Sequence, residues 1–247
     1  MPRDGYQKQL QSLREDVLYM SEIVLERLQM GLHALEQKDE DLAWEVIEGD
    51  HEVNELYLEL EQDCIDLLAL QQPVAGDLRF IAASFKIITD LERIADLATN
   101  LGDYTLDAEQ DLFPGVDAQE IGKEVIEMVE GAMDAYAEED PDACYEIADR
   151  DDVVDDMCET ASETVARDLI KREDIDDDET IELMMQDVHR LLLTIRDLER
   201  VGDQRSTSPP GRCTWSNLTT RCCTDRRAER WRRAITARGL RRRARHR

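Results

Sequence analysis

Apolar residues recur every three or four positions in six segments of the chain, and this spacing is typical of one face of an α-helix. Few stretches show the alternation of apolar and polar residues that marks a half-buried strand. The pattern therefore predicts an all-α protein of six long helices. The six segments are residues 10–35, 42–67, 78–101, 121–136, 143–169 and 181–203.

Short polar or proline-containing sequences separate these segments. Gln71–Pro73 ends the second segment, because the residue before a proline avoids the α conformation. Asp111–Gly115 contains Pro114 followed by Gly115 and predicts a linker between the third and fourth helices. Asp176–Asp178 precedes the last segment and places acids at the positive end of the helix dipole.

Two sequence matches indicate that the three helices before the linker and the three after it arose by duplication. Asp39–Val46 resembles Asp140–Ile147 at an offset of 101 residues, and Asp90–Asp96 matches Asp197–Asp203 at an offset of 107. We therefore predict two tandem three-helix bundles. The predicted divisions are a first bundle over residues 6–106, a second bundle over 116–203 whose last helix is truncated, and a basic tail over 204–247.

The net charge of −28 combines two unlike parts of the chain. Residues 204–247 hold 14 Arg and 2 acids, a charge of +12, whereas the preceding 203 residues carry −40. A body this acidic repels nucleic acid and anionic lipid, so we expect no nucleic-acid partner. With only five Lys in the chain, its composition resembles that of halophilic proteins.

Neither a membrane span nor a secretory signal is evident in the sequence. The chain has no run of 18 apolar residues, so we expect no direct membrane insertion. Residues 1–10 lack the apolar region of a signal peptide, and this predicts a cytoplasmic location.

Acidic residues in the repeated motif are the candidates for binding a cation. Glu92 and Asp96 each lie about 20° from the azimuth of Phe85, so we expect both to extend an apolar stripe. Carboxylates on a core-facing stripe must be paired, solvated or bound to a cation. Two acids one helical turn apart can share a hard cation through their oxygen atoms.

The second repeat offers the same arrangement. Glu199 and Asp203 are expected on the face of Leu192. On the second helix of each repeat, Asp50 and Asn54 match Asp151 and Asp155, and these residues are candidates for further oxygen ligands. In a chain with 58 acids, such pairs also arise by chance or serve ion pairs on the helix surface. A metal site and a purely structural role both remain open at this point.

Three features together resemble the PhoU family of phosphate-uptake regulators. They are Ala69–Arg79, with the sequence ALQQPVAGDLR, the two DLER motifs, and the tandem three-helix layout. The resemblance covers residues 6–203. It implies a non-enzymatic negative regulator of phosphate uptake that binds the ATPase subunit of the phosphate ABC transporter and, where present, a sensor histidine kinase. We also expect a homodimer.

The resemblance further implies that iron or zinc binds through E/D-x-x-x-D motifs. Two departures weaken this site in the first repeat, where Leu97 follows the last acid and Asn54 replaces an acid. The positions that match the family's metal motifs are Glu92, Asp96, Glu199 and Asp203, together with Asp151 and Asp155.

Two rival functions remain open. A helical adaptor that regulates another transporter would have the same architecture. A carboxylate-bridged metal oxidase is suggested by Glu48 and His51, in a Glu-x-x-His spacing, but such sites need two of these motifs. His189 is preceded by Gln186 at the corresponding position, which argues against the oxidase.

The basic tail interrupts the pattern of the repeats and has three interpretations: a frameshifted end, a disordered basic extension, and an arm that binds acidic partners. One permitted choice of codons for Ser206–Asn217, read two bases later, encodes N-I-A-A-R-T-L-Y-M-V-E. This sequence resembles the last helical turns of the family. With one base restored, its Asn follows Asp203 at the spacing that separates Asn100 from Asp96, and this favours the frameshift.

Overall fold

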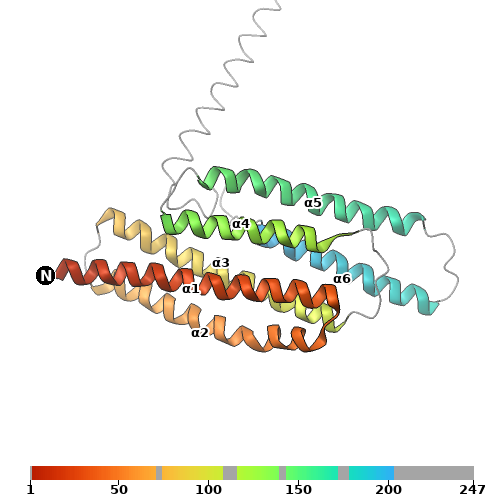
Figure 1. Cartoon of the computed structure of the whole chain (residues 1–247), viewed down its shortest axis with the longest axis horizontal. Helices are drawn as coiled ribbons and strands as arrows, with labels where there is room; N and C mark the ends of the chain where they lie inside the picture. The colour runs from red at the N-terminus through yellow and green to blue at the C-terminus, as the bar shows by residue number, and fades with distance from the viewer. Residues whose placement is uncertain (1, 71–73, 108–115, 139–142, 172–177, 203–247) are drawn as a thin grey trace, which may run out of the picture.

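The computed structural model describes residues 2–70, 74–107, 116–138, 143–171 and 178–202, and these residues form six α-helices (Figure 1). The described residues contain no strand. The all-α class and the two three-helix bundles predicted from the sequence are therefore confirmed. The helices are α1 (Pro2–Gln37), α2 (Glu40–Leu70), α3 (Ala75–Leu106), α4 (Ala118–Glu138), α5 (Ala143–Lys171) and α6 (Asp178–Gly202).

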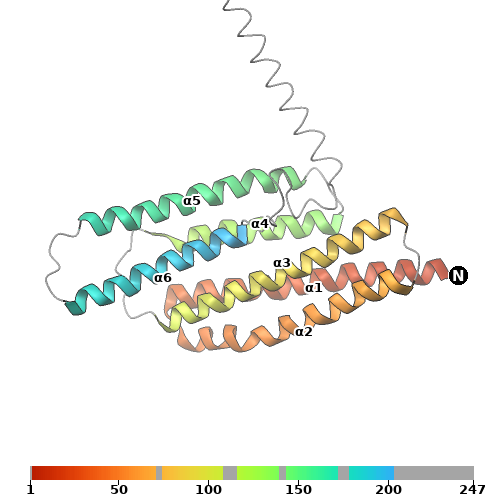
Figure 2. The same ribbon diagram turned by 180° about the vertical axis from the view of Figure 1, so that it is seen from behind.

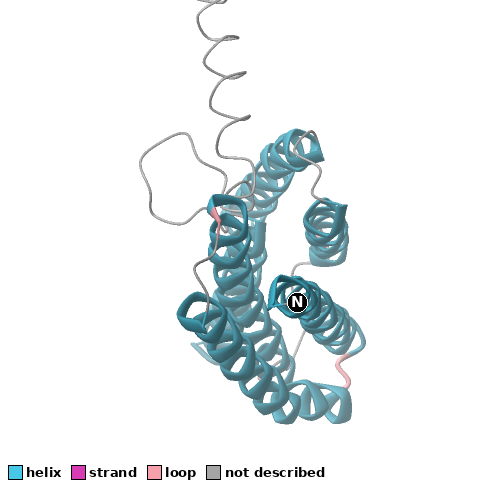
Figure 3. Cartoon of the chain, turned by 90° about the vertical axis from the view of Figure 1, so that its left-hand side faces the viewer, coloured by secondary structure: helices cyan, strands magenta, loops and turns pink. Residues whose placement is uncertain are grey.

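The helices are arranged as two bundles that lie against each other along their length. Helices α1, α2 and α3 pack together, and so do α4, α5 and α6. The pairs α1–α4 and α3–α6 join the bundles, which leaves α2 and α5 on opposite outer edges (Figures 1 and 2). Figure 3 views the long helices end-on. None of the described helices is long and apolar enough to cross a membrane.

The apolar stripe of α1 forms the centre of the first bundle. Leu13, Val17, Met20, Val24 and Leu28 are at most 1 % exposed, and their three- and four-residue spacing places them on one face. Burying each such side chain stabilises the fold by about 1.5–3 kcal/mol. This contribution explains why long helices with polar outer faces are stable here.

Aromatic and polar contacts attach α4 to the first bundle. The Tyr136 ring stacks on Phe80 of α3 with 5.8 Å between centroids, and the hydroxyls of Tyr136 and Ser84 are 2.9 Å apart. The Gln119 side chain donates to the Leu32 carbonyl of α1 at 2.6 Å. Gly122 permits the close approach, since a Cβ there would lie 2.5 Å from a Leu32 methyl group.

A tight connection between α1 and α2 begins at Lys38, whose φ of 55° lies in the left-handed region. The Asp39 amide donates to the Ala34 carbonyl at 3.1 Å, as in a Schellman motif. The Asp39 carboxylate also accepts a hydrogen bond from the Leu42 amide at 3.1 Å and so caps α2. This reversal makes α1 and α2 antiparallel neighbours.

Replacing Lys38→Gly should stabilise the protein by about 0.5–1 kcal/mol, because glycine adopts positive φ without the steric penalty of a Cβ. Gln37→Gly is the matched control, since Gln37 is the last residue of α1 and glycine weakens a helix there. Urea denaturation of both variants measures the effect. A loss of stability in Lys38→Gly would contradict the assigned conformation.

Candidate functional site

The acidic residues predicted from the first repeat lie together on α2 and α3. Burial, followed by the charges of Asp96 and Asp50, raises the pKa of Glu92. Burial and then the charge of Asp50 raise the pKa of Asp96. Asp50 itself accepts hydrogen bonds from Asn54 at 2.7 Å and from Thr99 of α3 at 3.5 Å. The structure therefore brings three carboxylates from two helices into electrostatic contact.

The corresponding acids of the second repeat gather on α5. Carboxylate oxygens of Asp151, Asp152 and Asp155 all lie within 4.8 Å of one another, and Asp151 is buried. The sequence prediction included Asp151 and Asp155 but missed Asp152. Burial, followed by the charges of Glu199 on α6 and Asp155 on α5, raises the pKa of the nearby Cys158 thiol to about 12. Asp203 falls outside the described residues.

The ligand atoms available at these clusters are oxygens. Cys158 is buried, its raised pKa keeps the thiol neutral, and its sulfur contacts the Ile195 carbonyl at 3.8 Å. His51 is exposed, and its Nδ1 is 2.6 Å from the carbonyl of Glu48 in its own helical turn. The oxygen donors fit a hard divalent cation or iron, whereas structural zinc sites are usually built from Cys and His.

Glu199 does not lie on a core-facing stripe, contrary to the prediction from the sequence. Leu192, which was expected to mark that stripe, is 40 % exposed, and Glu199 is also exposed. In the first repeat, Glu92 is half-buried and Asp96 is exposed. Glu92, Asp96 and Glu199 therefore lie at the border between core and solvent, where a cation can reach them.

The buried acids of the DLER motifs are instead their first residues, Asp90 and Asp197, which the sequence analysis did not select. Asp90 is 6 % exposed and Asp197 is 1 % exposed. The spacing of the apolar residues could have identified both acids. Asp90 precedes buried Ile94 and Leu97 by four and seven residues. Asp197 precedes buried Val201 by four residues. Both acids thus lie on the core face of their helices.

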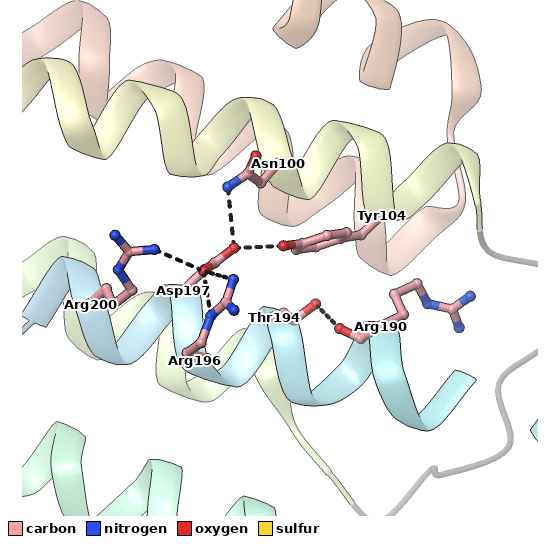
Figure 4. A network of polar contacts seen from close by, with 7 residues as sticks. All are labelled: Asn100, Tyr104, Arg190, Thr194, Arg196, Asp197 and Arg200. Carbon is pink, nitrogen blue, oxygen red and sulfur yellow. Dashed lines mark hydrogen bonds and ion pairs between the residues drawn. The ribbon is translucent and has the colours of Figure 1, made fainter. Parts of the chain in front are cut away.

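Asp197 forms the polar junction between α6 and α3 (Figure 4). Its Oδ2 accepts hydrogen bonds from the Tyr104 hydroxyl at 2.7 Å and the Asn100 amide at 3.3 Å, both on α3. Its Oδ1 accepts from Arg196 Nη2 at 2.9 Å and Nε at 3.2 Å, and Arg200 approaches to 3.9 Å. These donors compensate for the burial of the carboxylate and link two helices from different bundles.

Asp90 occupies the matching position in the first repeat, but fewer side chains of the described residues pair with its carboxylate. Its contact is an ion pair with Arg93, one turn along the same helix, at 3.6 Å. Within the described part of the chain, no hydrogen bond reaches Asp90 from another helix. Burial raises the pKa of Asp90 to about 6, although the charges of Arg93 and Lys86 oppose the shift.

Comparison with known proteins agrees with this architecture. The family model described as PhoU domain matches residues 17–105 and again residues 118–206, once in each repeat. The chain belongs to the PhoU family. Its resemblance to that family, inferred from the sequence, is therefore confirmed, and the two matches reflect the internal duplication.

Individual members of the PhoU family are similar over most of the chain. The phosphate-specific transport system accessory protein PhoU of Escherichia coli is 31 % identical over 201 residues, which cover 81 % of this chain and 80 % of that protein. A homolog of that accessory protein from Methanothermobacter thermautotrophicus is 32 % identical over 206 residues, covering 82 % and 90 %. The crystal structure of PhoU from Pseudomonas aeruginosa superposes with a TM-score of 0.73 at 27 % identity, covering 86 % of this chain and 94 % of that one.

Replacing Asp90→Asn should stabilise this PhoU-family chain by up to about 3 kcal/mol at pH 7. Because the folded-state pKa lies above the unfolded value, the native state binds the proton more tightly, and stability falls as the pH rises from about 4 to 6. The gain should therefore shrink to about 1 kcal/mol at pH 4.5. Urea denaturation at both pH values tests this, and a gain that does not depend on pH would contradict it.

Replacing Asp197→Ala should destabilise the protein by about 2 kcal/mol, because Tyr104 and Asn100 lose their shared acceptor. A double-mutant cycle with Tyr104→Phe isolates the contribution of the shortest of these hydrogen bonds. Additive effects of the two substitutions would show that this hydrogen bond contributes nothing.

Proposed function

We propose that this chain is an accessory protein of a phosphate-specific transport system and restrains phosphate uptake by binding the ATPase subunit of the transporter. The names of its PhoU relatives support the link to phosphate transport. In this proposal the protein acts by binding and not by catalysis. The structural observation that supports it is an apolar stripe on the outer face of α2.

The α2 stripe consists of Trp44, Leu58 and Ile65, which are 53 %, 60 % and 46 % exposed. Their separations are multiples of seven residues, so they follow one face of the helix. Because α2 lies at the outer edge of the first bundle, neither α4 nor α6 covers this face (Figures 1 and 2). Exposed apolar side chains aligned in this way are typical of a surface that binds a partner.

Comparison of the two repeats indicates that the bundle fold does not require large apolar residues at two of the three positions of the α2 stripe, whereas Trp44 is matched by Tyr145. At the matching offset of 101 residues, α5 carries Glu159 and Ala166 in place of Leu58 and Ile65. Glu159 and Ala166 are exposed too, yet α5 packs against α4 and α6 as α2 packs against α1 and α3. An apolar surface without a role in folding is consistent with a role in binding.

The charges beside the α2 stripe specify its partner further. Exposed acids follow the stripe along one side, and they are Glu48, Glu55, Glu59 and Asp66. A complementary surface of the ATPase subunit would combine apolar residues with Lys or Arg. High ionic strength screens the charged contacts, so the apolar contacts should then supply most of the affinity.

Replacing Leu58→Glu together with Ile65→Glu should weaken binding to the transporter ATPase at least tenfold, because the substitutions place charges at two of the three positions of the α2 stripe. Val153→Glu on α5 is the matched control, since Val153 is 47 % exposed on the outer helix of the other bundle. The measurement is the affinity for the purified ATPase subunit, followed by phosphate uptake in cells. Equal affinity of the two variants would contradict the role of the α2 stripe.

We further propose that the acidic clusters hold a divalent metal ion. Asp151, Asp152 and Asp155 would coordinate it in the second repeat, and Glu92 and Asp96 in the first. Of the two metals implied by the family, iron suits these oxygen donors better than zinc. A bound cation would also relieve the repulsion between neighbouring carboxylates, which stabilises the fold.

Ferrous or manganous ion should raise the unfolding temperature, and Asp151→Asn with Asp155→Asn should abolish that rise. Asp156→Asn is the control, since Asp156 is an exposed neighbour on α5 outside the cluster. Anaerobic thermal denaturation with and without metal measures the difference. An equal rise in all variants would locate the metal elsewhere.

The partners and the location expected from the sequence extend this proposal. We propose that the protein also binds a sensor histidine kinase, forms a homodimer and acts in the cytoplasm, and each of these agrees with a protein that acts by binding. If the protein regulates a different transporter, the α2 stripe would bind the ATPase subunit of that transporter. An oxidase would consume oxygen with iron bound, and this assay separates it from a regulator.

A further inference from the structure

We propose that a cavity between the N-terminal parts of α1 and α3 binds a phosphate group, either free inorganic phosphate or the phosphate of a nucleotide. The cavity has a volume of about 510 Å³. Both helices begin at the same end of the first bundle, where they pack against each other (Figure 1). The proposal does not rest on the proposed binding of the ATPase subunit, because the α2 stripe takes no part in the cavity.

Two arginines from different helices line the cavity. They are Arg14 of α1 and Arg79 of α3. The Arg14 guanidinium lies over the Phe80 ring, 5.0 Å from its centroid, so stacking holds the plane of the guanidinium. Guanidinium groups are suited to phosphate, because their N–H groups match its oxygen atoms in bidentate hydrogen bonds.

The charge of the cavity differs in sign from that of the surrounding protein. Of the described residues that line it, Asp77 is the only acid, so these residues together carry +1. The first 203 residues carry −40. A local positive charge in such an acidic chain indicates a site for an anion.

The first turn of α3 adds backbone donors to the cavity. Its first helical hydrogen bond runs from the Leu78 amide to the Val74 carbonyl at 3.0 Å, so the amides of residues 75–77 have no acceptor within the helix. Val74 is the N-cap residue and forms no capping hydrogen bond through its side chain. Gly76 lines the cavity, and a Cβ there would meet no atom within 4 Å. The positive end of the helix dipole therefore borders open space.

A buried tyrosine hydroxyl beside these groups has no hydrogen-bond partner among the described residues. Tyr6 is 4 % exposed and lies one turn before Leu10, a residue that lines the cavity, on the same face of α1. Burial, followed by the charge of Asp77, raises the pKa of Tyr6, so the hydroxyl keeps its proton and remains a donor. A buried donor without an acceptor costs free energy, which a ligand oxygen would recover.

Asp77 gives the cavity a means of selecting phosphate over other oxyanions. Inorganic phosphate keeps at least one proton at neutral pH, and its hydroxyl group donates to a carboxylate. The ribose hydroxyls of a nucleotide donate in the same way. Sulfate carries no proton at this pH, so the Asp77 carboxylate repels it.

Comparison of the repeats shows that the start of the third helix does not need the polar residues of the cavity. At the offset of 107 residues, Gly76, Asp77 and Arg79 of α3 correspond to Leu183, Met184 and Gln186 of α6. The three residues of α3 belong to Ala69–Arg79, a sequence by which the chain resembles its family. A role in binding accounts for their presence in the first repeat alone.

The test measures the affinity of the full chain for inorganic phosphate by isothermal titration calorimetry, after divalent metals have been removed with EDTA. Arg79→Gln should weaken this affinity at least tenfold, and Gln186 shows that the helix accepts glutamine at the matching position. Arg167→Gln is the matched control, since Arg167 is exposed on α5 and pairs with Glu163 at 3.6 Å. It removes the same charge outside the cavity and should leave the affinity unchanged.

Two further ligands define the group that binds. Tighter binding of ATP than of inorganic phosphate would identify a nucleotide as the ligand, and weaker binding would identify free phosphate. Sulfate should bind at least tenfold more weakly than phosphate. Asp77→Asn should remove most of this preference, because an amide donates to either anion.

Two results would overturn the proposal. One is the absence of binding heat with both inorganic phosphate and ATP. The other is an equal affinity of the Arg79→Gln and Arg167→Gln variants, which would place the anion elsewhere, for example on the 14 arginines of residues 204–247. Where Arg79→Gln fails to fold, Asp77→Asn decides, since an unchanged preference for phosphate over sulfate would also overturn the proposal.

Discussion

The buried carboxylate of Asp197 constrains how the two bundles meet. A carboxylate at 1 % exposure is tolerated because four side chains from α3 and α6 surround it, and two of them come from the other bundle. Sliding α6 by one turn would leave Asp197 buried without Tyr104 and Asn100. The junction therefore selects one register among the several that apolar packing alone would allow.

Duplication explains why the two halves share a core and differ on their outer faces. The packing of three helices around an apolar stripe recurs in both bundles, and it needs only the spacing of apolar residues. The outward faces of α2 and α5 are free of that constraint. Accordingly, α2 exposes Leu58 and Ile65 where α5 exposes Glu159 and Ala166. Function is better sought in such differences between the repeats than in the features that they share.

The sequence was sufficient to predict the helices and the repeat, because both depend on local periodicity and on matched motifs. It also predicted that acids of the second and third helices come together, as Asp50 and Glu92 do. It did not identify Asp197 as the junction, because its partners Asn100 and Tyr104 lie more than 90 residues away and only the register of α3 against α6 reveals them. The expectation that Leu192 lies on a buried face was wrong for the same reason. A helical wheel gives the direction of a side chain but does not show which neighbouring helix covers that face.

Carboxylates near the core of this acidic chain are stabilised in different ways in different regions of the structure. Repulsion among 56 carboxylates in the body favours expansion of the fold, so the acids that remain near the core need compensation. Asp197 obtains it from hydrogen bonds and arginines, whereas the Asp151 cluster is suited to a cation. Asp90 has an ion pair with Arg93 at 3.6 Å, and burial outweighs this charge and that of Lys86 and raises the pKa of Asp90 to about 6.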